Sequence, residues 1–484
     1  MEHQHSHASK NQSKKSKNNN MPGKLITMIQ LILSAAFLII LWNSGMLPGL
    51  YLALLGGGLF LLFAVTFCLQ YVKNKSKYLG MVISILVSIV LAIGIVYFLR
   101  VQKTMEEVGG ATYKTDNMIV VVKASDPAES ILDAGNYRFG YQTATDQKNN
   151  QMMMDDVEKV VGRELNLTEY GTVTDLANAL LSGQVEAAIY NEAFNGIIEE
   201  SIEGYTDQIK ILYQYGIETP IEQEETNVEE PFNVYISGID VSGPITTNSR
   251  SDVNIIMTVN PNTKKILLTT TPRDYYVTIP GISGEQRDKL THAGIYGVDA
   301  SMATLENLYG IDISYYARVN FTSLITIVDA LGGVDVNSEY AFSAGGYDFK
   351  QGINSLDGKA ALAFSRERYS FQSGDNQRGK NQEAVLTAIL QKAMSPAILT
   401  SANQVLAEVS SCVQTNMTQD EMAKFINMQL SDGASWTIES AAVSGTGDSQ
   451  ACYSSGAQLL YVMWPDEAIV GDLSRRMNQV LEGN

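Results

Sequence analysis

The sequence predicts an α/β protein anchored in a membrane, and three observations carry this prediction. Three long apolar runs lie within the first 100 residues. Beyond them, short apolar or alternating segments that are typical of strands interleave with segments of helical length. An acidic stretch then divides this α/β region into a smaller and a larger domain. For the larger domain the interleaving predicts an α/β/α sandwich, in which a mixed sheet lies between helices.

The apolar runs cover about Leu25–Trp42, Leu47–Tyr71 and Leu79–Leu99. Each is long enough to cross a hydrocarbon layer of ~30 Å at about 1.5 Å per residue. Five lysines precede the first run, three separate the second from the third, and the loop after the first run has no charge. The positive-inside rule therefore predicts a multi-pass plasma-membrane protein with a cytoplasmic N-terminus and an extracellular part beyond about residue 101. A cleaved signal peptide is the alternative for the first run, but a small-residue cleavage site is lacking and two more runs follow.

The charge of the chain is unevenly distributed. The whole sequence carries −18, but residues 101–484 hold 25 of the 34 basic and 51 of the 52 acidic residues, a net charge of −26. An outer part this acidic argues against nucleic-acid binding, so we expect a local site where arginines gather. The lysines of the N-terminal tail are instead expected to contact anionic membrane lipids.

Cysteine usage agrees with an outer location of the larger part. Cys68 lies inside the second apolar run, whereas Cys412 and Cys452 are the only cysteines beyond the membrane region. An even pair in an oxidising compartment suggests a disulfide between them.

These patterns predict five regions. They are a basic cytoplasmic tail (1–24), three transmembrane helices (25–100), an accessory α/β domain (112–216), an acidic linker (217–231) and the larger outer domain (232–484). The linker holds six glutamates, two prolines and no basic residue, a composition typical of an extended chain.

The accessory domain is expected to contain short strands and two helices. Its strands are predicted at 118–123, 137–142, 187–190 and 210–215, and its helices at 147–162 and 173–182. The region loosely resembles a single lobe of an extracellular solute-binding protein but has no ligand motif. We therefore expect an accessory or partner-binding role for it.

The larger domain is expected to alternate strands with helices. Strands are predicted at 232–240, 254–261, 265–274, 334–336 and 437–443, and helices at 300–309, 321–331, 382–393 and 421–430, while 281–297 is glycine-rich and irregular. In such sheets ligands bind at strand ends, which is where the charged residues of this domain fall.

The stretch Ala361–Gln382 holds the densest group of arginines. Arg366 and Arg368 are two residues apart, so on an extended segment their guanidinium groups would share one face and suit phosphate oxygens. After Gly374, Arg378 and Gln382 are four apart across the predicted start of a helix, where free N–H groups favour an anion. The alternative for the first pair is a solvated salt-bridge strand.

Carboxylates and further arginines lie at the ends of the first three strands of this domain. Asp240 and Asp252 flank the turn between two adjacent strands, and paired carboxylates suit Mg²⁺ or Mn²⁺, although ordinary turn chemistry is the alternative for each. Arg250 and Arg273 bring the arginines of the group to five. Such a site, without a histidine base, predicts handling of a polyphosphate with a divalent ion by charge stabilisation.

Other chemistries fit the sequence less well. Residues 374–380 approach a nucleotide-binding loop, but Asn381 stands where Ser or Thr should hold the metal. His292 is the only histidine outside the tail, and without a G-x-S-x-G elbow it is expected to be structural. An adequate set of zinc ligands is also lacking.

An ordered set of motifs resembles the LytR–CpsA–Psr family of cell-wall enzymes, and the membrane part and accessory domain resemble its CpsA branch. The resemblance covers about residues 232–393. Its motifs are Asp240, R-S-D at 250–252, P-R-D at 272–274, K-L-T-H-A at 289–293, G-G-V-D-V at 332–336, L-D-G-K-A-A-L-A-F-S-R-E-R at 356–368 and G-D-N-Q-R-x-x-N-Q at 374–382.

The resemblance implies an α/β fold with a lipid-lined pocket for a polyprenyl pyrophosphate. Carried over by position, Asp240 and Asp252 would hold Mg²⁺ or Mn²⁺. The arginines that would grip the pyrophosphate are Arg250, Arg273, Arg366, Arg368 and Arg378. Asp375, Gln382 and Lys289 would complete the substrate-binding set, with Asp375 and Gln382 ordering the arginines.

Two functions follow as hypotheses. The first is a phosphotransferase on a Gram-positive cell surface, with a pyrophosphatase side activity, that moves a glycopolymer, expected to be capsular polysaccharide, from undecaprenyl pyrophosphate to peptidoglycan. The candidates for its general base are Asp274 and Asp375. The alternative is a membrane sensor that binds the lipid-linked precursor and signals to a capsule or wall polymerisation complex without transfer.

Overall fold

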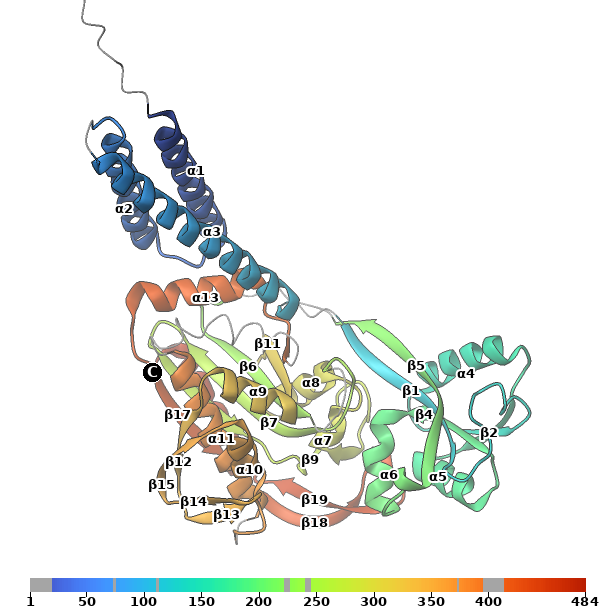
Figure 1. Ribbon diagram of the computed structural model, residues 1–484. Coiled ribbons are helices and arrows are strands. Elements are labelled where there is room, and N and C mark those ends of the chain that lie inside the picture. Colours follow the sequence, from blue (N-terminus) through green and yellow to red (C-terminus); the bar gives the residue numbers. More distant parts are fainter. Residues whose placement is uncertain are drawn as a thin grey trace, which may run out of the picture. The chain divides into compact units, whose positions relative to one another are not determined.

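The computed structural model of the chain describes residues 20–72, 75–109, 113–221, 227–239, 245–371, 374–394 and 413–484. Three N-terminal helices are long and apolar enough to cross a membrane: α1 (Met21–Asn43), α2 (Gly49–Leu69) and α3 (Ser76–Val108) (Figure 1). Gln30 of α1 connects them, because its Oε1 accepts hydrogen bonds from Thr66 of α2 at 3.0 Å and from Ser84 of α3. Polar contacts of this kind hold apolar helices together where burial alone gives no preference.

Residues 113–220, the predicted accessory domain, form a five-stranded mixed sheet with helices on both faces, in one compact unit with the predicted larger domain (Figure 1). Its strand order is β3-β2-β4-β1-β5, and β1 pairs antiparallel with both neighbours. Residues of β1 alternate between two cores: Ile119 and Val121 pack with α5, whereas Met118 and Val120 pack with α4. Its elements are β1 (Tyr113–Lys123), β2 (Arg138–Gln142), α4 (Gln147–Val161), β3 (Asn166–Tyr170), α5 (Val173–Ser182), β4 (Ala187–Asn191), η1 (Glu192–Phe194), α6 (Asn195–Ser201), η2 (Thr206–Gln208) and β5 (Ile209–Pro220).

A six-stranded mixed sheet in the order β16-β11-β6-β7-β8-β17 forms the centre of the larger domain. Its strands are β6 (Phe232–Ile239), β7 (Ser251–Asn260), β8 (Lys265–Thr270), β11 (Tyr315–Asn320), β16 (Val413–Thr415) and β17 (Thr437–Ala442). The pairs β6–β7 and β7–β8 are antiparallel, whereas β6–β11 and β8–β17 are parallel. The sheet is therefore mixed, as the sequence predicts.

Helices cover both faces of this sheet, which confirms the predicted α/β/α sandwich. On one face, Ile256 and Leu267 pack with α8 (Val298–Tyr309) and α14 (Glu467–Glu482). On the other, Ile255 and Leu268 pack with α11 (Asp375–Ala393) and with the start of α13 (Gln419–Asp432). Alternate residues of one strand thus serve two cores.

Smaller elements surround the sheet. A separate core joins α9, α10 and α11 to two small two-stranded sheets, β12–β15 and the hairpin β13–β14. The remaining elements are β9 (Tyr276–Thr278), β10 (Arg287–Lys289), α7 (Leu290–Ala293), α9 (Phe321–Ala330), β12 (Val334–Ser338), β13 (Phe342–Ala344), β14 (Tyr347–Phe349), β15 (Gly352–Leu356), α10 (Gly358–Arg366), β18 (Gly445–Ala451), η3 (Tyr453–Ser455) and β19 (Leu459–Pro465).

Local signals in the sequence explain several helix ends. The Asn320 side chain caps α9 by accepting from the Ser323 backbone N–H at 2.8 Å, as predicted. Gly332 follows that helix at φ 74°, a left-handed conformation that glycine adopts without strain. Thr418 and Glu421 form the expected capping box before α13.

Four expectations need correction. The segment that ends at Arg366 is helix α10 rather than a strand, and the third strand of the larger domain stops at Thr270 rather than at residue 274. The irregular region 281–297 contains β10 and α7. Residues 217–220 of the predicted linker belong to β5, which hydrogen-bonds β1.

The accessory and larger domains contact each other through backbone and side chains. Thr115 of β1 donates its N–H to Thr246 O at 3.0 Å, and Asn248 N–H donates to Thr115 O at 2.9 Å. Lys114 Nζ lies 2.8 Å from Asp299 Oδ1 of α8. Ile295 of the larger domain is buried in the accessory core that contains α5 and α6. The accessory domain is therefore packed against the larger one.

Candidate active site

The candidate site lies where β7 begins and β8 ends, and its centre is the ion pair of Asp252 and Arg273. Arg273 Nη1 lies 3.0 Å from Asp252 Oδ1, which also accepts from Thr291 Oγ1 at 3.2 Å. Asp252 takes part in β7, and the preceding Ser251 pairs with Ile239 at the end of β6. Arg273 and Thr291 reach Asp252 from the loop after β8 and from α7. Two adjacent strands therefore bring the site together, as the sequence predicts.

Helix α11 forms another wall of the site. Arg378 and Gln382 line a small hollow together with Asp252 and Arg273; its other lining residues are Asn254, Thr270, Thr271, Pro272, Gly379, Ala442 and Val443. The hollow measures about 20 Å³, close to the space that one water molecule needs. Because α11 starts at Asp375, its first turn approaches the site, as expected. The side chain of Asp375 lies outside the described residues.

The arginines keep Asp252 ionised. Burial raises the pKa of its carboxyl, but the positive charges of Arg273, Arg250 and Arg378 outweigh this effect, so the pKa lies below its usual value. The same three guanidinium groups can bind phosphate oxygens, because each is permanently charged and presents its donors in a plane.

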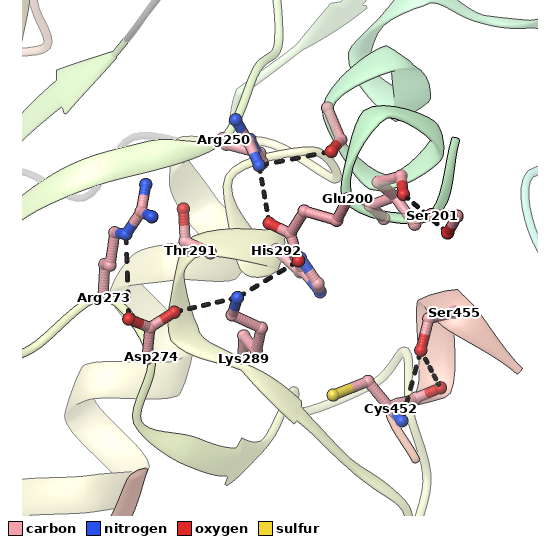
Figure 2. Close-up of polar contacts among 12 residues, drawn as sticks. Glu200, Ser201, Arg250, Arg273, Asp274, Lys289, Thr291, His292, Cys452 and Ser455 are labelled. Carbon is pink, nitrogen blue, oxygen red and sulfur yellow. Dashed lines mark hydrogen bonds and ion pairs between the residues drawn. The ribbon is translucent and has the colours of Figure 1, made fainter. Parts of the chain in front are cut away.

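A second group of charges adjoins this centre and includes a residue of the accessory domain. Lys289 Nζ lies 2.9 Å from Asp274 Oδ1 and 3.3 Å from Glu200 Oε2 (Figure 2). Arg250 Nη1 lies 2.8 Å from Glu200 Oε1. Asp274 Oδ2 is also 3.8 Å from Arg273 Nε, so the two groups of charges are continuous.

Arg366 and Arg368 do not sit as the sequence predicted. Arg366 is the last residue of α10 and Arg368 follows the helix, so the two do not share the face of a strand. The Arg366 guanidinium lies 4.3 Å from the Phe321 ring centre, and Arg368 lies 4.7 Å from that of Tyr369. Such stacking on rings is typical of arginine. Within the described part of the chain, their contacts are thus with aromatic rings rather than with Asp252.

The predicted metal ligands are only partly described. Asp240 lies outside the described residues, so its distance from Asp252 stays a prediction. Asp252 itself fits a hard cation: it is a carboxylate with a lowered pKa, and the two contacts given above both involve Oδ1. Mg²⁺ is usually bound through one or two carboxylates together with substrate phosphates.

His292 is fully buried. Its Nδ1 lies 2.6 Å from Asp288 Oδ1 and 3.1 Å from Ser454 Oγ, and all three residues belong to the interior. This arrangement agrees with the structural role expected for His292. Cys452 precedes that serine by two residues and is a free, buried thiol, so the structure does not contain the disulfide that the sequence predicted; Cys412 lies outside the described residues.

Three residues of or beside the site were not singled out from the sequence: Glu200, Thr291 and Glu383. Thr291 could have been found, because it stands inside the K-L-T-H-A motif. Glu383 follows Gln382 on α11, and burial raises its pKa to about 7. Glu200 comes from another domain, and only its place in the fold reveals it.

Comparison with known sequences identifies the family of this chain. A sequence model of the LytR_cpsA_psr family matches residues 200–466, which is more than half of the chain. The chain belongs to the LytR_cpsA_psr family. The match includes the strands that carry Asp252 and Arg273, and also Glu200 at its first position.

Relatives of this LytR_cpsA_psr protein include two named transferases. The polyisoprenyl-teichoic acid–peptidoglycan teichoic acid transferase TagU of Enterococcus faecalis is 40% identical over 205 residues, which are 42% of this chain and 67% of TagU. The protein of the same name from Bacillus subtilis is 33% identical over 257 residues, 53% of this chain and 80% of its own length. The crystal structure of B. subtilis TagU aligns with a TM-score of 0.42 and 31% identity, covering 52% of this chain and 97% of TagU.

Proposed function

We propose that this protein is a transferase that moves a glycopolymer from a polyprenyl-pyrophosphate carrier to peptidoglycan. Membership of the LytR_cpsA_psr family and the names of its relatives support this assignment. The observation that carries it is the ion pair of Arg273 with Asp252 at 3.0 Å, beside which Arg378 lines the same small hollow. The positive charge of Arg250 also lowers the pKa of Asp252. Guanidinium groups gathered at one half-buried carboxylate suit a substrate with several phosphate oxygens.

The residues of the site stabilise charge rather than form a covalent bond with the substrate. In the reaction, a sugar hydroxyl of peptidoglycan attacks the phosphorus that bears the polymer. The P–O bond to the bridging oxygen breaks, and polyprenyl phosphate leaves with that oxygen and its electron pair. Guanidinium groups fixed by ion pairs, such as Arg273 on Asp252 at 3.0 Å, bind the oxygens on which negative charge grows. The hydroxyl proton passes to a base or to water; Asp274 and Asp375 stay candidates for that base.

Magnesium is part of the proposal. Asp252 would hold the ion, together with Asp240 and with phosphate oxygens of the substrate. Bound there, the ion would neutralise phosphate charge. Mn²⁺ has the same preference for oxygen ligands and would serve equally.

The substrates and the membrane location fit together. Three apolar helices precede the outer domains, and the lysines that flank them favour an extracellular site. A polyprenyl carrier in that membrane and the peptidoglycan outside it would then be on the same side. For the polymer we keep capsular polysaccharide as the proposal, and a capsule or wall polymerisation complex as the partner.

Alanine variants of the arginines test the assignment. Full-length Arg273→Ala and Arg378→Ala in detergent, supplied with polyprenyl-pyrophosphate-linked polymer, peptidoglycan and Mg²⁺, should release polyprenyl phosphate at least about 100-fold more slowly. Arg475→Ala removes an exposed arginine that pairs with Asp472 at 2.9 Å, and should keep the wild-type rate. Native rates in both site variants would refute the site assignment. Binding of the carrier by the wild type without any release would favour the sensor hypothesis.

A further inference from the structure

A carboxylate of the accessory domain lies between two cations of the larger domain. Glu200, in the last turn of α6, places Oε1 2.8 Å from Arg250 Nη1 and Oε2 3.3 Å from Lys289 Nζ (Figure 2). The two oxygens of one carboxylate therefore contact two different positive groups. This is the geometry that two oxygens of a phosphate group would adopt between the same cations.

The fold of the accessory domain fixes Glu200 at this point. Ile197 and Ile198 of the same helix are fully buried, in the core that also contains Ile295 of the larger domain. The carbonyl of Gly196 accepts from Arg250 Nη1 at 3.4 Å. A Cβ atom at Gly196 would come within 2.5 Å of the Arg250 guanidinium, so the glycine allows the arginine to lie against the helix.

The dipole of its own helix does not favour the charge of Glu200 at its position in α6. A carboxylate in the last turn of a helix faces the negative end of the helix dipole, which disfavours it. The neighbouring Glu199 avoids this problem because its oxygens accept the N–H groups of Gly204 and Thr206. Glu200 is instead stabilised by Arg250 and Lys289, and the Lys289 side chain is only 5% exposed.

Glu200 offsets part of the positive charge of the group. Four cations, Arg250, Arg273, Arg378 and Lys289, face three carboxylates, Asp252, Asp274 and Glu200. A pyrophosphate that approached Arg250 and Lys289 would meet a like charge at close range, which costs free energy in a partly buried site. The hollow beside Arg273 measures about 20 Å³, which is smaller than a pyrophosphate group.

We infer that Glu200 is an internal competitor for the phosphate groups of the substrate. Its carboxylate contacts Arg250 and Lys289 in place of phosphate oxygens, and the substrate binds by displacing it. The accessory domain thereby sets the affinity of the larger domain for its anionic ligand. This inference rests on the proposed function in one respect, namely that the ligand is a polyprenyl pyrophosphate.

The test compares Glu200→Gln with the wild type. Gln keeps the shape of the side chain but removes the competing charge. Binding of farnesyl pyrophosphate, and separately of inorganic pyrophosphate, is measured calorimetrically with full-length protein in detergent and Mg²⁺. We expect Glu200→Gln to lower both dissociation constants by at least about fivefold, the lower end of usual coupling between sites. Glu186→Gln, which loses an ion pair with Arg138 inside the accessory domain, is the matched control and should bind as the wild type does.

The outcomes separate this inference from the proposed function. Equal affinity of Glu200→Gln and the wild type overturns the inference, and so does weaker binding, which would mean that Glu200 orients Arg250 for the ligand. If Glu200→Gln fails to fold in a thermal scan, Glu200→Asp replaces it. Its shorter side chain should lower the dissociation constants of the pyrophosphates by a smaller factor, and unchanged dissociation constants overturn the inference. Tighter binding of inorganic pyrophosphate without any release of polyprenyl phosphate would instead refute the proposed transfer and leave the competitor role of Glu200 standing.

Discussion

Replacement of Glu383 by glutamine should change how the stability of the protein depends on pH. Glu383 follows Gln382 on α11 and is 4% exposed. Burial raises its pKa from 4.5 to about 7, and the neighbouring Thr270 and the charge of Lys380 offset this only in part. The buried side chain is therefore protonated near pH 5 and ionised near pH 8.

The sign and size follow from the difference between the folded and unfolded states. Between pH 4.5 and about 7 the folded protein keeps a proton on Glu383 that the unfolded chain has lost. The free energy of unfolding therefore falls as pH rises through this window, and the contribution is fully lost above pH 7. A difference of about 2.5 pKa units corresponds to about 3 kcal/mol. Glutamine does not titrate, so Glu383→Gln should lack this decline.

Thermal unfolding of the full chain in detergent at pH 5 and pH 8 measures the effect. The free energy of unfolding of Glu383→Gln, relative to that of the wild type, should be about 3 kcal/mol higher at pH 8 than at pH 5. At ~2–4 °C per kcal/mol for a domain of this size, that is about 6–12 °C in Tm.

A matched variant controls for the loss of one acidic group. Glu339→Gln removes a half-exposed carboxylate that pairs with Lys380 at 3.2 Å beside the same helix. A hydrogen bond with Tyr340 lowers the pKa of Glu339, so this variant should keep the wild-type decline. A Glu383→Gln effect of equal size at both pH values would refute the reasoning.

Two further substitutions test one contact between the domains and one buried contact within the larger domain. Gly196→Ala should displace the Arg250 guanidinium, because a Cβ atom would come within 2.5 Å of it. The variant should release polyprenyl phosphate ~10- to 100-fold more slowly, while circular dichroism shows the same amount of folded protein. An unchanged rate would show that Arg250 tolerates the shift. Arg318→Met should destabilise the chain, because Arg318 is buried and donates to Thr247 O at 2.8 Å and to Gln414 Oε1 at 3.1 Å. Each of these acceptor oxygens that loses its hydrogen bond costs ~1–3 kcal/mol of stability. Faster hydrogen exchange at residues 245–248 and a lower Tm would confirm this, and Arg476→Met on the exposed side of α14 should change neither.

The elements that the sequence predicted well carry their signals locally. Helix α9 has a cap at Asn320 and a stop at Gly332, and the strands β7 and β8 each contain a short apolar run, at 255–257 and 266–268. The C-terminal helix α14 was missed although similar signals exist: Asp466 accepts from the N–H of Ala468 at 3.0 Å, and Gly483 ends the helix at φ 84°.

The arginine stretch shows how a local rule can mislead. The spacing of Arg366 and Arg368 favours a strand only if the segment is extended. The alanines before them favour a helix, and Asp357 caps it by accepting from Ala360 N–H at 2.8 Å. The helix propensity and the N-cap of the whole segment thus outweigh the two-residue spacing of the arginines.

The sequence predicted the part of the site that the larger domain supplies, but it did not predict the contact that the accessory domain adds. The grouping of Asp252, Arg273 and Arg378 follows from charged residues at strand ends and at a helix start. The contact of Glu200 with Arg250 joins residues 50 positions apart through the packing of two separate cores. Neither its spacing nor its neighbours in sequence point to such a contact.

The pairing of β1 with β5 determines how the accessory domain is connected to the rest of the chain. The two strands pair from Tyr113 opposite Pro220 to Lys123 opposite Ile209, so the chain enters and leaves the domain side by side, about 5 Å apart. The domain thus has the connectivity of an insertion, which can be gained, lost or exchanged without moving the flanking residues. In evolution, a catalytic domain could acquire Glu200 in a single event, together with the whole scaffold that holds it.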